Sequence, residues 1–344
     1  MTENRPSSRE HSIVLRVRAV AIVNGHARGL TTKLRARFEE ALPGNVRFTE
    51  SLDDARSVIR AELRRGCELM IFGGGDGTVV MGLTLLGEAS RAYGKPEPAI
   101  GVLRMGSGNA IADTVGAGDD VIDELSRLSR GAGTRRELPL LDVLGVRAPF
   151  VGMGLDAQLL EDNERVGRVV DRLPGARFIG GGARYALSVA LRSVPRFALG
   201  TRPTATVMNR GASAIEMRRG GATGRELPRD EQLWTGPCTL VAGATIPYFG
   251  FGLKMFAFAS TREHAFHLRC GDAGLLEIMR NAPAAFRGDY FSDHVSDFMC
   301  ERVEICLDRE AAIEAGGELL GRQSKVELAL GQSITVLSLA TSSW

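Results

Sequence analysis

The chain has 344 residues, 44% of them hydrophobic, and a formal net charge of +2. This length exceeds the roughly 100–200 residues of one typical domain, so two domains are expected. A charge so close to zero argues against a nucleic-acid-binding scaffold. The five cysteines form no Cys-x-x-Cys pair, and the polar residues 1–11 lack the apolar segment of a signal peptide. Reduced thiols in a cytoplasmic protein are therefore expected.

Strand-like and helix-like patterns alternate from residue 13 to about residue 115, as they do in the βαβ units of a parallel sheet. Helices are predicted over residues 30–42, 52–65, 78–88 and 121–130. The segment 131–134, Gly-Ala-Gly-Thr, reads as a boundary. The sequence thus predicts an α/β nucleotide-binding domain over residues 13–136.

The most informative segment is residues 69–78, Leu-Met-Ile-Phe-Gly-Gly-Gly-Asp-Gly-Thr. An apolar strand runs through glycines into a helix, which gathers backbone N–H groups and the positive end of the helix dipole around one point. That arrangement suits a phosphate, whose close approach a Cβ would block. Asp76, a carboxylate among these amides, is expected to hold a metal ion or a hydroxyl proton. A turn that binds nothing is the alternative for a single motif of this kind.

Two further strand-to-turn-to-helix junctions strengthen the phosphate interpretation. Residues 99–112 contain Gly-Ser-Gly-Asn at 106–109, and residues 24–29 follow the apolar strand 19–23. The turns that follow parallel strands meet at the carboxyl edge of the sheet, where open α/β folds bind their ligands. We therefore expect all three turns to contribute to one site.

Short apolar strands dominate the rest of the chain. We predict them over residues 138–146, 150–153, 204–208, 239–242, 265–269, 302–307, 325–330 and 333–339, with one helix at about 182–194 and an exposed hairpin loop at 222–230. This pattern is typical of an antiparallel β-sandwich, expected over 137–330. The tail 331–344 is a candidate to return to the first domain.

Three stretches of the second half invite a functional interpretation. The apolar run 236–260 is interrupted by prolines and glycines, so two buried strands are favoured over a membrane span. Its loop 248–252 is a candidate to contact an acyl chain, with a core-packed turn as the alternative. The arginines between 165 and 202 favour a solvated helical face, with attraction to anionic lipid as the sharper alternative. His264 and His267 favour a structural role over a zinc site.

At this point the chain resembles a known family. Residues 74–78, Gly-Gly-Asp-Gly-Thr, resemble the signature of the diacylglycerol kinase catalytic domain, which sphingosine kinases and bacterial lipid kinases share. Residues 103–109 resemble the second motif of that family and residues 24–29 resemble its first. Residues 152–157, after Asp142, resemble the start of its second domain, and residues 314–318 resemble its Asp-Gly-Glu segment. The resemblance implies an α/β domain with a parallel sheet, as in NAD kinases, followed by an antiparallel β-sandwich.

The resemblance also implies an ATP-dependent kinase that transfers the γ-phosphate to a lipid hydroxyl with Mg²⁺. The implied nucleotide-binding residues are Asn24, Gly73, Gly74, Gly75, Gly77, Thr78, Gly106, Ser107 and Asn109. The implied catalytic residues are Asp76, Glu318 and Glu314, with Asp76 and Glu318 as metal ligands. The expected partner is a lipid at a membrane surface, with peripheral membrane association and no transmembrane segment. The oligomeric state stays open, with a homodimer as one option.

Three departures from the family pattern define the alternatives. Arg104 replaces a Pro and Ser107 a Thr, and Gly316 stands where the family usually carries the Asp of Asp-Gly-Glu. The loss at 316 leaves room for a catalytically weak nucleotide-binding regulatory protein. An NAD kinase-like enzyme is the other alternative, although the segment 106–109 favours the lipid kinases. Diacylglycerol, a sphingoid base, ceramide and an isoprenoid alcohol all stay open as acceptors.

Overall fold

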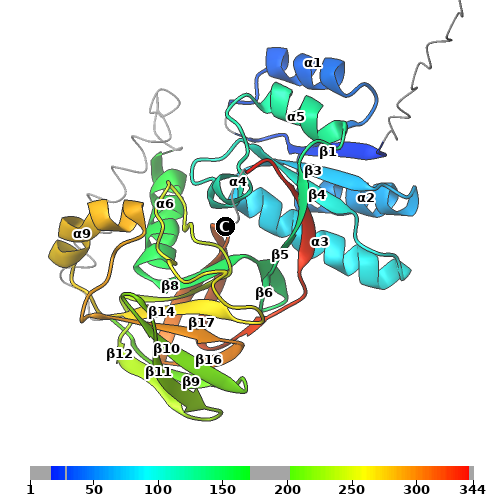
Figure 1. Ribbon diagram of the computed structural model, residues 1–344. Helices are drawn as coiled ribbons and strands as arrows, with labels where there is room; N and C mark the ends of the chain where they lie inside the picture. Colours follow the sequence, from blue (N-terminus) through cyan, green and yellow to red (C-terminus); the bar gives the residue numbers. More distant parts are fainter. Residues whose placement is uncertain (1–16, 28, 171–201, 341–344) are drawn as a thin grey trace, which may run out of the picture.

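The computed structural model describes residues 17–27, 29–170 and 202–340 (Figure 1). Its N-terminal part is a six-stranded sheet in the order β2-β1-β3-β4-β18-β5. The strands are β1 (Ala19–Asn24), β2 (Val46–Thr49), β3 (Leu69–Gly74), β4 (Ala99–Arg104), β5 (Thr134–Leu138) and β18 (Ile334–Ser338). All neighbours are parallel except β18 and β5. The predicted α/β domain with a largely parallel sheet is confirmed.

Both faces of this sheet are covered by helices, because β1, β3 and β4 at its centre carry buried apolar residues on both faces. Val20 and Ile22 of β1 share a core with α2 (Leu52–Arg64) and α3 (Asp76–Tyr93). Ala21 and Val23 share the opposite core with α1 (Thr32–Ala41) and α5 (Val121–Ser129). Figure 1 shows α1 and α5 together on one side of the sheet. A short helix, α4 (Ala110–Val115), follows β4.

Three of the helices begin where a side-chain oxygen caps the first turn. Thr31, Ser51 and Asp120 accept backbone N–H groups at the starts of α1, α2 and α5. Such caps stabilise a helix by roughly 1 kcal/mol each and explain why these starts lie close to the predicted ones. Helix α3 is longer than predicted, since it begins at Asp76 and runs to Tyr93.

The second part is an antiparallel sheet of twelve strands among the described residues. Its central strands are β8 (Phe150–Gly154), β13 (Leu240–Ala244), β14 (Phe266–Gly271), β16 (Arg302–Ala315) and β17 (Glu318–Leu330). The others are β6 (Leu141–Val143), β7 (Val146–Ala148), β9 (Thr204–Asn209), β10 (Ser213–Arg218), β11 (Gly221–Pro228), β12 (Gln232–Pro237) and β15 (Val295–Cys300). Register shifts inside β16 let one end pair with β9 and the other with β8. The antiparallel β-rich second part agrees with the prediction.

Several element predictions for this part need correction. The helices α6 (Leu155–Val170) and α9 (Leu275–Arg287) and the strands β10, β12 and β15 were not predicted. The predicted strand 138–146 is broken, because Leu144 and Gly145 turn the chain with positive φ between β6 and β7. The predicted hairpin loop 222–230 is largely strand β11. The helix predicted at 182–194 lies outside the described residues.

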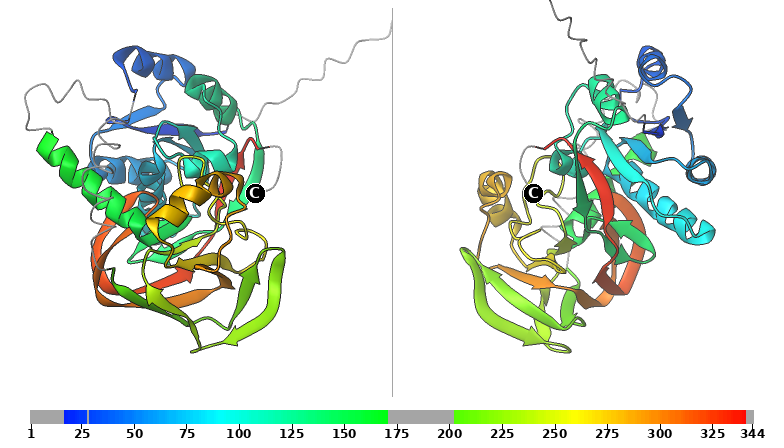
Figure 2. Two further views of the ribbon diagram at one scale, coloured as in Figure 1. Left: turned by 90° about the vertical axis from the view of Figure 1, so that its left-hand side faces the viewer. Right: turned by 45° about the vertical axis from the view of Figure 1, so that its right-hand side comes forward.

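Two connections join the sheets, and they are hydrogen-bonded to each other. The chain leaves the first sheet after β5 and returns to it through β18, the red strand in Figures 1 and 2. In the two connecting segments, Gly331, which precedes β18, donates its backbone N–H to the carbonyl oxygen of Leu140, which follows β5, at 2.8 Å. Helix α3 also packs on β7, where buried Arg147 pairs with Glu97 at 2.6 Å. Within the described ranges, no helix is long and apolar enough to cross a membrane.

Candidate functional site

The turns after β1, β3 and β4 lie together at the carboxyl edge of the parallel sheet. Asn24, the last residue of β1, donates from Nδ2 to Thr78 Oγ1 in the first turn of α3, at 3.1 Å. Its Oδ1 accepts from His26 N at 2.9 Å, which shapes its own turn. The side chains of Asn24 and Thr78 thus hold the first and second turns against each other.

The second and third turns touch through their backbones. A Cβ on Gly106 would lie 2.4 Å from Cα of Gly75, and a Cβ on Gly74 would lie 2.4 Å from Thr78. Neither contact can be relieved by moving the end of a flexible side chain. Glycine is therefore required at 74 and 106 for packing within the protein, whether or not a phosphate binds there. Gly73 lies deeper, as a buried residue of β3 whose Cβ would press on Val23 and Met105.

Asp76 joins α3 to α4. Its Oδ2 accepts from Ala110 N at 3.0 Å and its Oδ1 from Ile111 N at 2.9 Å, so the carboxylate caps α4 from another element. Burial raises the pKa of Asp76, and the amide donors oppose that shift. These bonds use two of the roughly four acceptor positions of the carboxylate. Asp76 therefore fixes the relative position of two loops in this structure.

The other polar residues in and next to the third turn either hold the turn in shape or lie at its surface. Asn109 adopts a left-handed conformation, and its side chain bonds Gly106 N and Gly106 O, each at 2.9 Å. Arg104, the replacement for the family Pro, pairs with Asp113 and donates to Ala117 O. Ser107 is exposed at the tip of the turn. The turn is thus held in shape by Asn109 and presents Ser107 outward.

The second part of the chain brings Glu318 to the same place. A Cβ on Gly77 would lie only 2.0 Å from Glu318 Oε1, so this exposed carboxylate lies against the first turn of α3. A carboxylate near a helix N-terminus is favoured by the helix dipole. Glu318 is therefore the acid that the fold places beside the glycine-rich turn from outside the first sheet.

Two buried carboxyl groups, Asp156 and Glu314, form a pair close to Glu318. A Cβ on Gly152 would lie 1.7 Å from Asp156 Oδ2 and 3.0 Å from Glu314 Oε1, so both oxygens occupy the space that this glycine leaves. Glu314 Oε2 accepts from Gly317 N at 2.7 Å. Both oxygens of Asp156 and Oε1 of Glu314 are buried without a hydrogen-bond partner among the described residues.

The pair is electrostatically unusual. Burial raises the pKa of Asp156 to about 7. Burial, reinforced by the negative charge of Asp156, raises the pKa of Glu314 well above its ordinary value. Such perturbed carboxyls cluster at functional sites. Asp156 was not among the predicted site residues, although an acid two positions after an apolar strand that ends in glycine was a usable signal.

Residue 316 is a glycine where the family motif has an Asp, and the backbone conformation and packing at this position account for the difference. Its φ is +58°, and a Cβ there would lie 2.2 Å from Cγ2 of the buried Val80 in α3. An aspartate at 316 would meet both the left-handed backbone and this methyl group. The packing around residue 316 is thus built for glycine.

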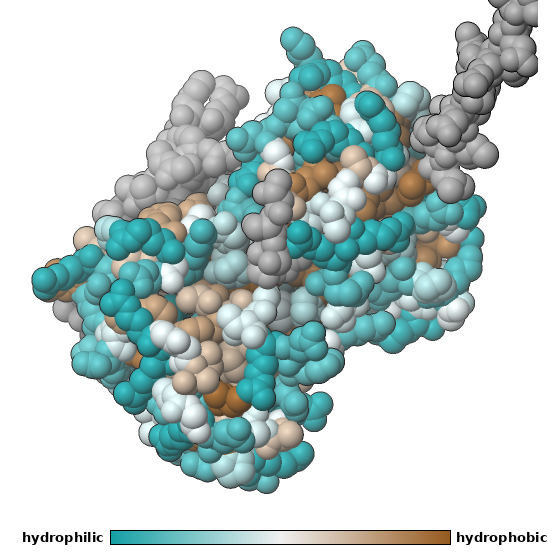
Figure 3. Space-filling view, viewed as in Figure 1, coloured by the Kyte–Doolittle hydropathy of each residue, from teal (hydrophilic) through white to brown (hydrophobic). Residues whose placement is uncertain are grey.

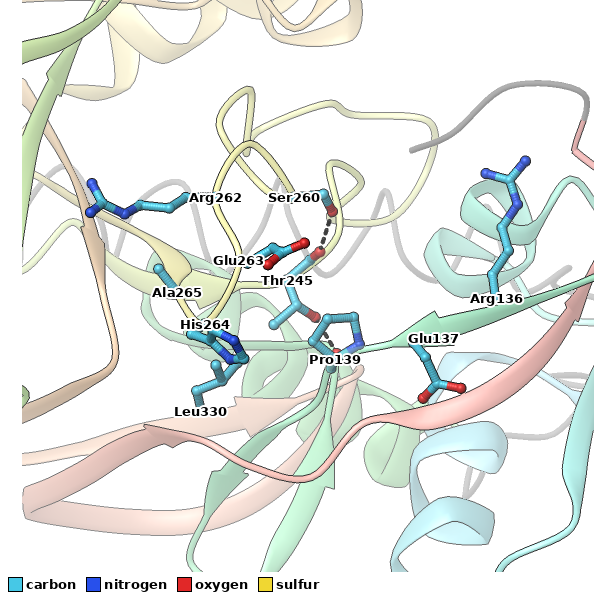
Figure 4. Close-up of a pocket in the computed structure, with 10 residues that line it drawn as sticks. All are labelled: Arg136, Glu137, Pro139, Thr245, Ser260, Arg262, Glu263, His264, Ala265 and Leu330. Carbon is cyan, nitrogen blue, oxygen red and sulfur yellow. Dashed lines mark hydrogen bonds between the residues drawn. The ribbon is translucent and has the colours of Figure 1, made fainter.

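Two other features lie apart from these residues. A cavity of about 250 Å³ lies between the inter-sheet connections and the loop before β14, lined in part by Arg136, Thr245 and Ser260 (Figure 4). It contains none of the predicted site residues. His267 is buried in a network with Arg269 and Asp297, at 2.8 Å from the Asp297 carboxylate. Across the described residues, no group of three or more His, Cys, Asp or Glu could hold a metal ion.

The oxygen atoms of the site can nevertheless be compared with those that Mg²⁺ requires. Mg²⁺ keeps several waters and takes one or two carboxylates together with substrate phosphates, so a preformed cage is not needed. Glu318, exposed beside α3, fits that demand, and Asp76 fits it less well because backbone amides hold both of its oxygens.

Comparison with known proteins agrees with this geometry. Residues 18–139 match the family model of the diacylglycerol kinase catalytic domain. No curated protein sequence matches the chain. A solved structure from Bacillus anthracis str. Sterne, described as a "putative diacylglycerol kinase", is similar with a TM-score of 0.61 and 15% identity, over 94% of this chain and 97% of that one.

Two further structures from the same organism cover the same shares of both chains. One, described as a diacylglycerol kinase, has a TM-score of 0.58 at 13% identity. The other, described as a "putative diacylglycerol kinase", has a TM-score of 0.60 at 16% identity. Identities this low show a common fold, and the family match rests on the N-terminal part. The motif resemblance is thereby confirmed, because residues 18–139 match the model of the diacylglycerol kinase catalytic domain.

Proposed function

We propose that this protein is an ATP-dependent lipid kinase that transfers the γ-phosphate of ATP to the hydroxyl group of a lipid. The observation that carries the proposal is the meeting of three glycine-rich turns with Glu318 of the second sheet. Phosphoryl transfer needs positioning and charge neutralisation more than covalent chemistry. The backbone N–H groups around Gly74, Gly75 and Gly77 would bind the nucleotide phosphates, as at other helix N-termini.

Each of the remaining side chains would have its own role in the reaction. Asn24, Thr78 and Asn109 would keep the turns in their binding shape, with Ser107 facing the nucleotide and Gly73 and Gly106 allowing close packing. Asp76 would act as a positioning residue through its cap on α4. Glu318 would hold Mg²⁺, which neutralises charge on the phosphates when bound.

The proton of the acceptor hydroxyl needs a base in a chain without the family Asp. We assign this role to Glu314, coupled to Asp156, because Glu314 Oε1 has no hydrogen-bond partner among the described residues. Burial and the negative charge of Asp156 raise the pKa of Glu314 above its ordinary value, so this carboxylate would bind a proton more strongly than an ordinary one, as a general base must.

The test is transfer of γ-labelled phosphate from ATP and Mg²⁺ to detergent-solubilised diacylglycerol, sphingosine, ceramide and an isoprenoid alcohol, with NAD as a soluble control. Glu318→Gln should lower kcat roughly a hundredfold, the loss typical of a group that stabilises transition-state charge. Glu327→Gln is the matched control, since Glu327 lies on the same strand and pairs with Arg302 at its far end. It should keep full activity.

The remaining outcomes also decide the proposal. Label in NAD, and in no lipid, would identify an NAD kinase-like enzyme. ATP binding without transfer to any acceptor would favour a regulatory protein and would make Gly316 the first position to examine. Equal activity of Glu318→Gln and wild type would remove Glu318 from the reaction.

A further inference from the structure

Helix α9 turns large apolar side chains outward. Leu276, Met279 and Phe286 are 81%, 64% and 51% exposed, and Pro283, between them, is exposed as well. Their spacing of three and four residues places all four on one face of the helix. Water-exposed apolar side chains that gather on one face, rather than singly, mark an interaction surface.

The same face carries positive charge and no negative charge. Arg280 and Arg287 are exposed at the helical positions next to Leu276, Pro283 and Phe286. Neither guanidinium has an ion-pair partner among the described residues. The acid of the helix, Glu277, lies off this face and binds Tyr290 at 3.2 Å and Ser292. In Figure 3, apolar and polar groups lie side by side over α9, on the left.

The opposite side of α9 is fixed to the protein, so this orientation is not arbitrary. Ala285 is buried, and its carbonyl accepts from Lys254 N at 2.9 Å. Gly288 ends the helix in a left-handed conformation, where its own N–H donates to the same carbonyl at 3.2 Å. The helix cannot bury its apolar residues by turning about its axis without breaking the bond from Lys254.

The outward face continues through one loop to the candidate active site. Gly252 lies near the ring of Phe286, since a Cβ there would lie 3.9 Å from it. Phe251, 55% exposed, donates from its backbone N to Gly108 O at 2.9 Å. Gly108 belongs to the third glycine-rich turn, so a ligand on α9 would lie beside the nucleotide loops.

We propose that Leu276, Met279, Arg280, Pro283, Phe286 and Arg287, here called the α9 face, dock on an anionic lipid bilayer. Apolar groups that enter the headgroup region beside cations that meet lipid phosphates are the composition of an interfacial helix. A second copy of this chain is a poorer occupant. A symmetric contact through this face would oppose arginine to arginine, with no acid on the face to pair with them.

This inference deepens the proposed function, because it names how the enzyme reaches a membrane-embedded acceptor. Docking itself does not require phosphate transfer, so the two proposals can fail separately.

The experiment is co-sedimentation of the full chain with vesicles of phosphatidylcholine, alone or with phosphatidylglycerol. The wild type should bind the anionic vesicles, and more weakly as salt rises. Leu276→Ser with Met279→Ser and Phe286→Ser should lower the affinity at least tenfold. Arg280→Gln with Arg287→Gln should lower it roughly ten- to thirtyfold, as expected for two cations near an anionic surface.

Matched controls change the same chemistry elsewhere on the surface. Leu52→Ser removes an apolar side chain that is 53% exposed on α2, and Arg60→Gln with Arg91→Gln removes two exposed cations. Both should bind vesicles within about twofold of wild type if the α9 face is the docking surface. Equal losses in the controls would show non-specific attraction and overturn the proposal.

Three other outcomes would also overturn it: no binding to anionic vesicles, unchanged binding by the serine variant, or a dimer that the serine variant splits while vesicle binding stays the same.

A transfer assay separates docking from catalysis. The docking variants should lose phosphate transfer to lipid in vesicles and keep it with detergent-solubilised lipid. Vesicle binding that needs the α9 face, without transfer anywhere, would leave docking standing and remove the kinase proposal.

Discussion

At the scale of single residues, Asp76 shows that a side chain of a motif can make a structural contact that the motif does not predict. The sequence placed this acid among phosphate-binding amides and predicted chemistry for it. In the structure both of its oxygens accept amides at the start of α4. No local pattern reveals this contact, because Ala110 and Ile111 follow Asp76 by more than thirty residues and donate through their backbone.

The pair Asp156 and Glu314 leads to a prediction about pH. Burial raises the pKa of Asp156 from its ordinary value of 3.8 to about 7, so folding favours the protonated form. This preference adds to the free energy of unfolding. The contribution is fully present at pH values below the ordinary pKa of 3.8, and it is lost as the pH rises to about 7. The loss amounts to a few kcal/mol, at about 1.4 kcal/mol per pKa unit.

Asp156→Asn removes this titration, so its free energy of unfolding should fall less than that of wild type between pH 5 and pH 7.5. Urea unfolding at both pH values measures the difference. Asp53→Asn, at an exposed carboxylate on α2, should follow the wild-type curve. An equally steep fall in Asp156→Asn would show that the buried carboxyl does not titrate in this range.

At the scale of elements, the contact between the second and third turns depends on two glycines. A side chain on Gly106 would meet backbone atoms of Gly75 at 2.4 Å, so the turns would have to separate. Gly106→Ala should lower the free energy of unfolding by about 1–3 kcal/mol, as for overpacking elsewhere. It should also weaken ATP binding at least tenfold, measured by calorimetry.

Gly118→Ala is the control for this substitution. The nearest atom to a Cβ on Gly118 is 3.4 Å away, an ordinary contact. This variant should match wild type in stability and in ATP affinity. If Gly106→Ala matched wild type as well, the backbone contact would not be what holds the two turns together.

The helices also show which parts of the fold could be predicted from the sequence. The helices α1, α2 and α5 were predicted within about two residues at each end, because caps and apolar periodicity agree there. Helix α9 was not predicted, because Pro283 lies inside it and a proline within an apolar pattern usually marks a helix end. Pro283 also belongs to the α9 face on which the docking proposal rests.

At the scale of the whole molecule, the last described strand completes the first sheet. Strand β18 lies between β4 and β5, and β5 has no other strand partner among the described residues. Ile334, Val336 and Leu337 are buried there. A periodic pattern predicted a strand at 333–339, and the tail was a candidate to return to the first domain. Its place between β4 and β5 depends on long-range pairing that local residues do not specify.

A chain that ends at Leu330 tests this dependence. Loss of three buried apolar side chains costs roughly 4.5–9 kcal/mol at about 1.5–3 kcal/mol each, which is comparable to the whole stability of a typical domain. The shortened chain should therefore lose cooperative thermal unfolding by circular dichroism and should aggregate during gel filtration. A chain that ends at Ala340 keeps β18 and should unfold as wild type does. A cooperative transition at the wild-type temperature in the shorter chain would contradict the assigned role of β18.

The position of β18 also has a consequence for how the protein is made. A ribosome adds about 5–20 residues per second. The segment between β5 and β18, residues 139–333, therefore separates the synthesis of these neighbours by roughly 10–40 seconds. During that time the edge of β4 has no strand to cover it and β5 has no pairing partner, a state in which strand edges recruit other chains. The α/β domain therefore has an open strand edge until its last strand is made.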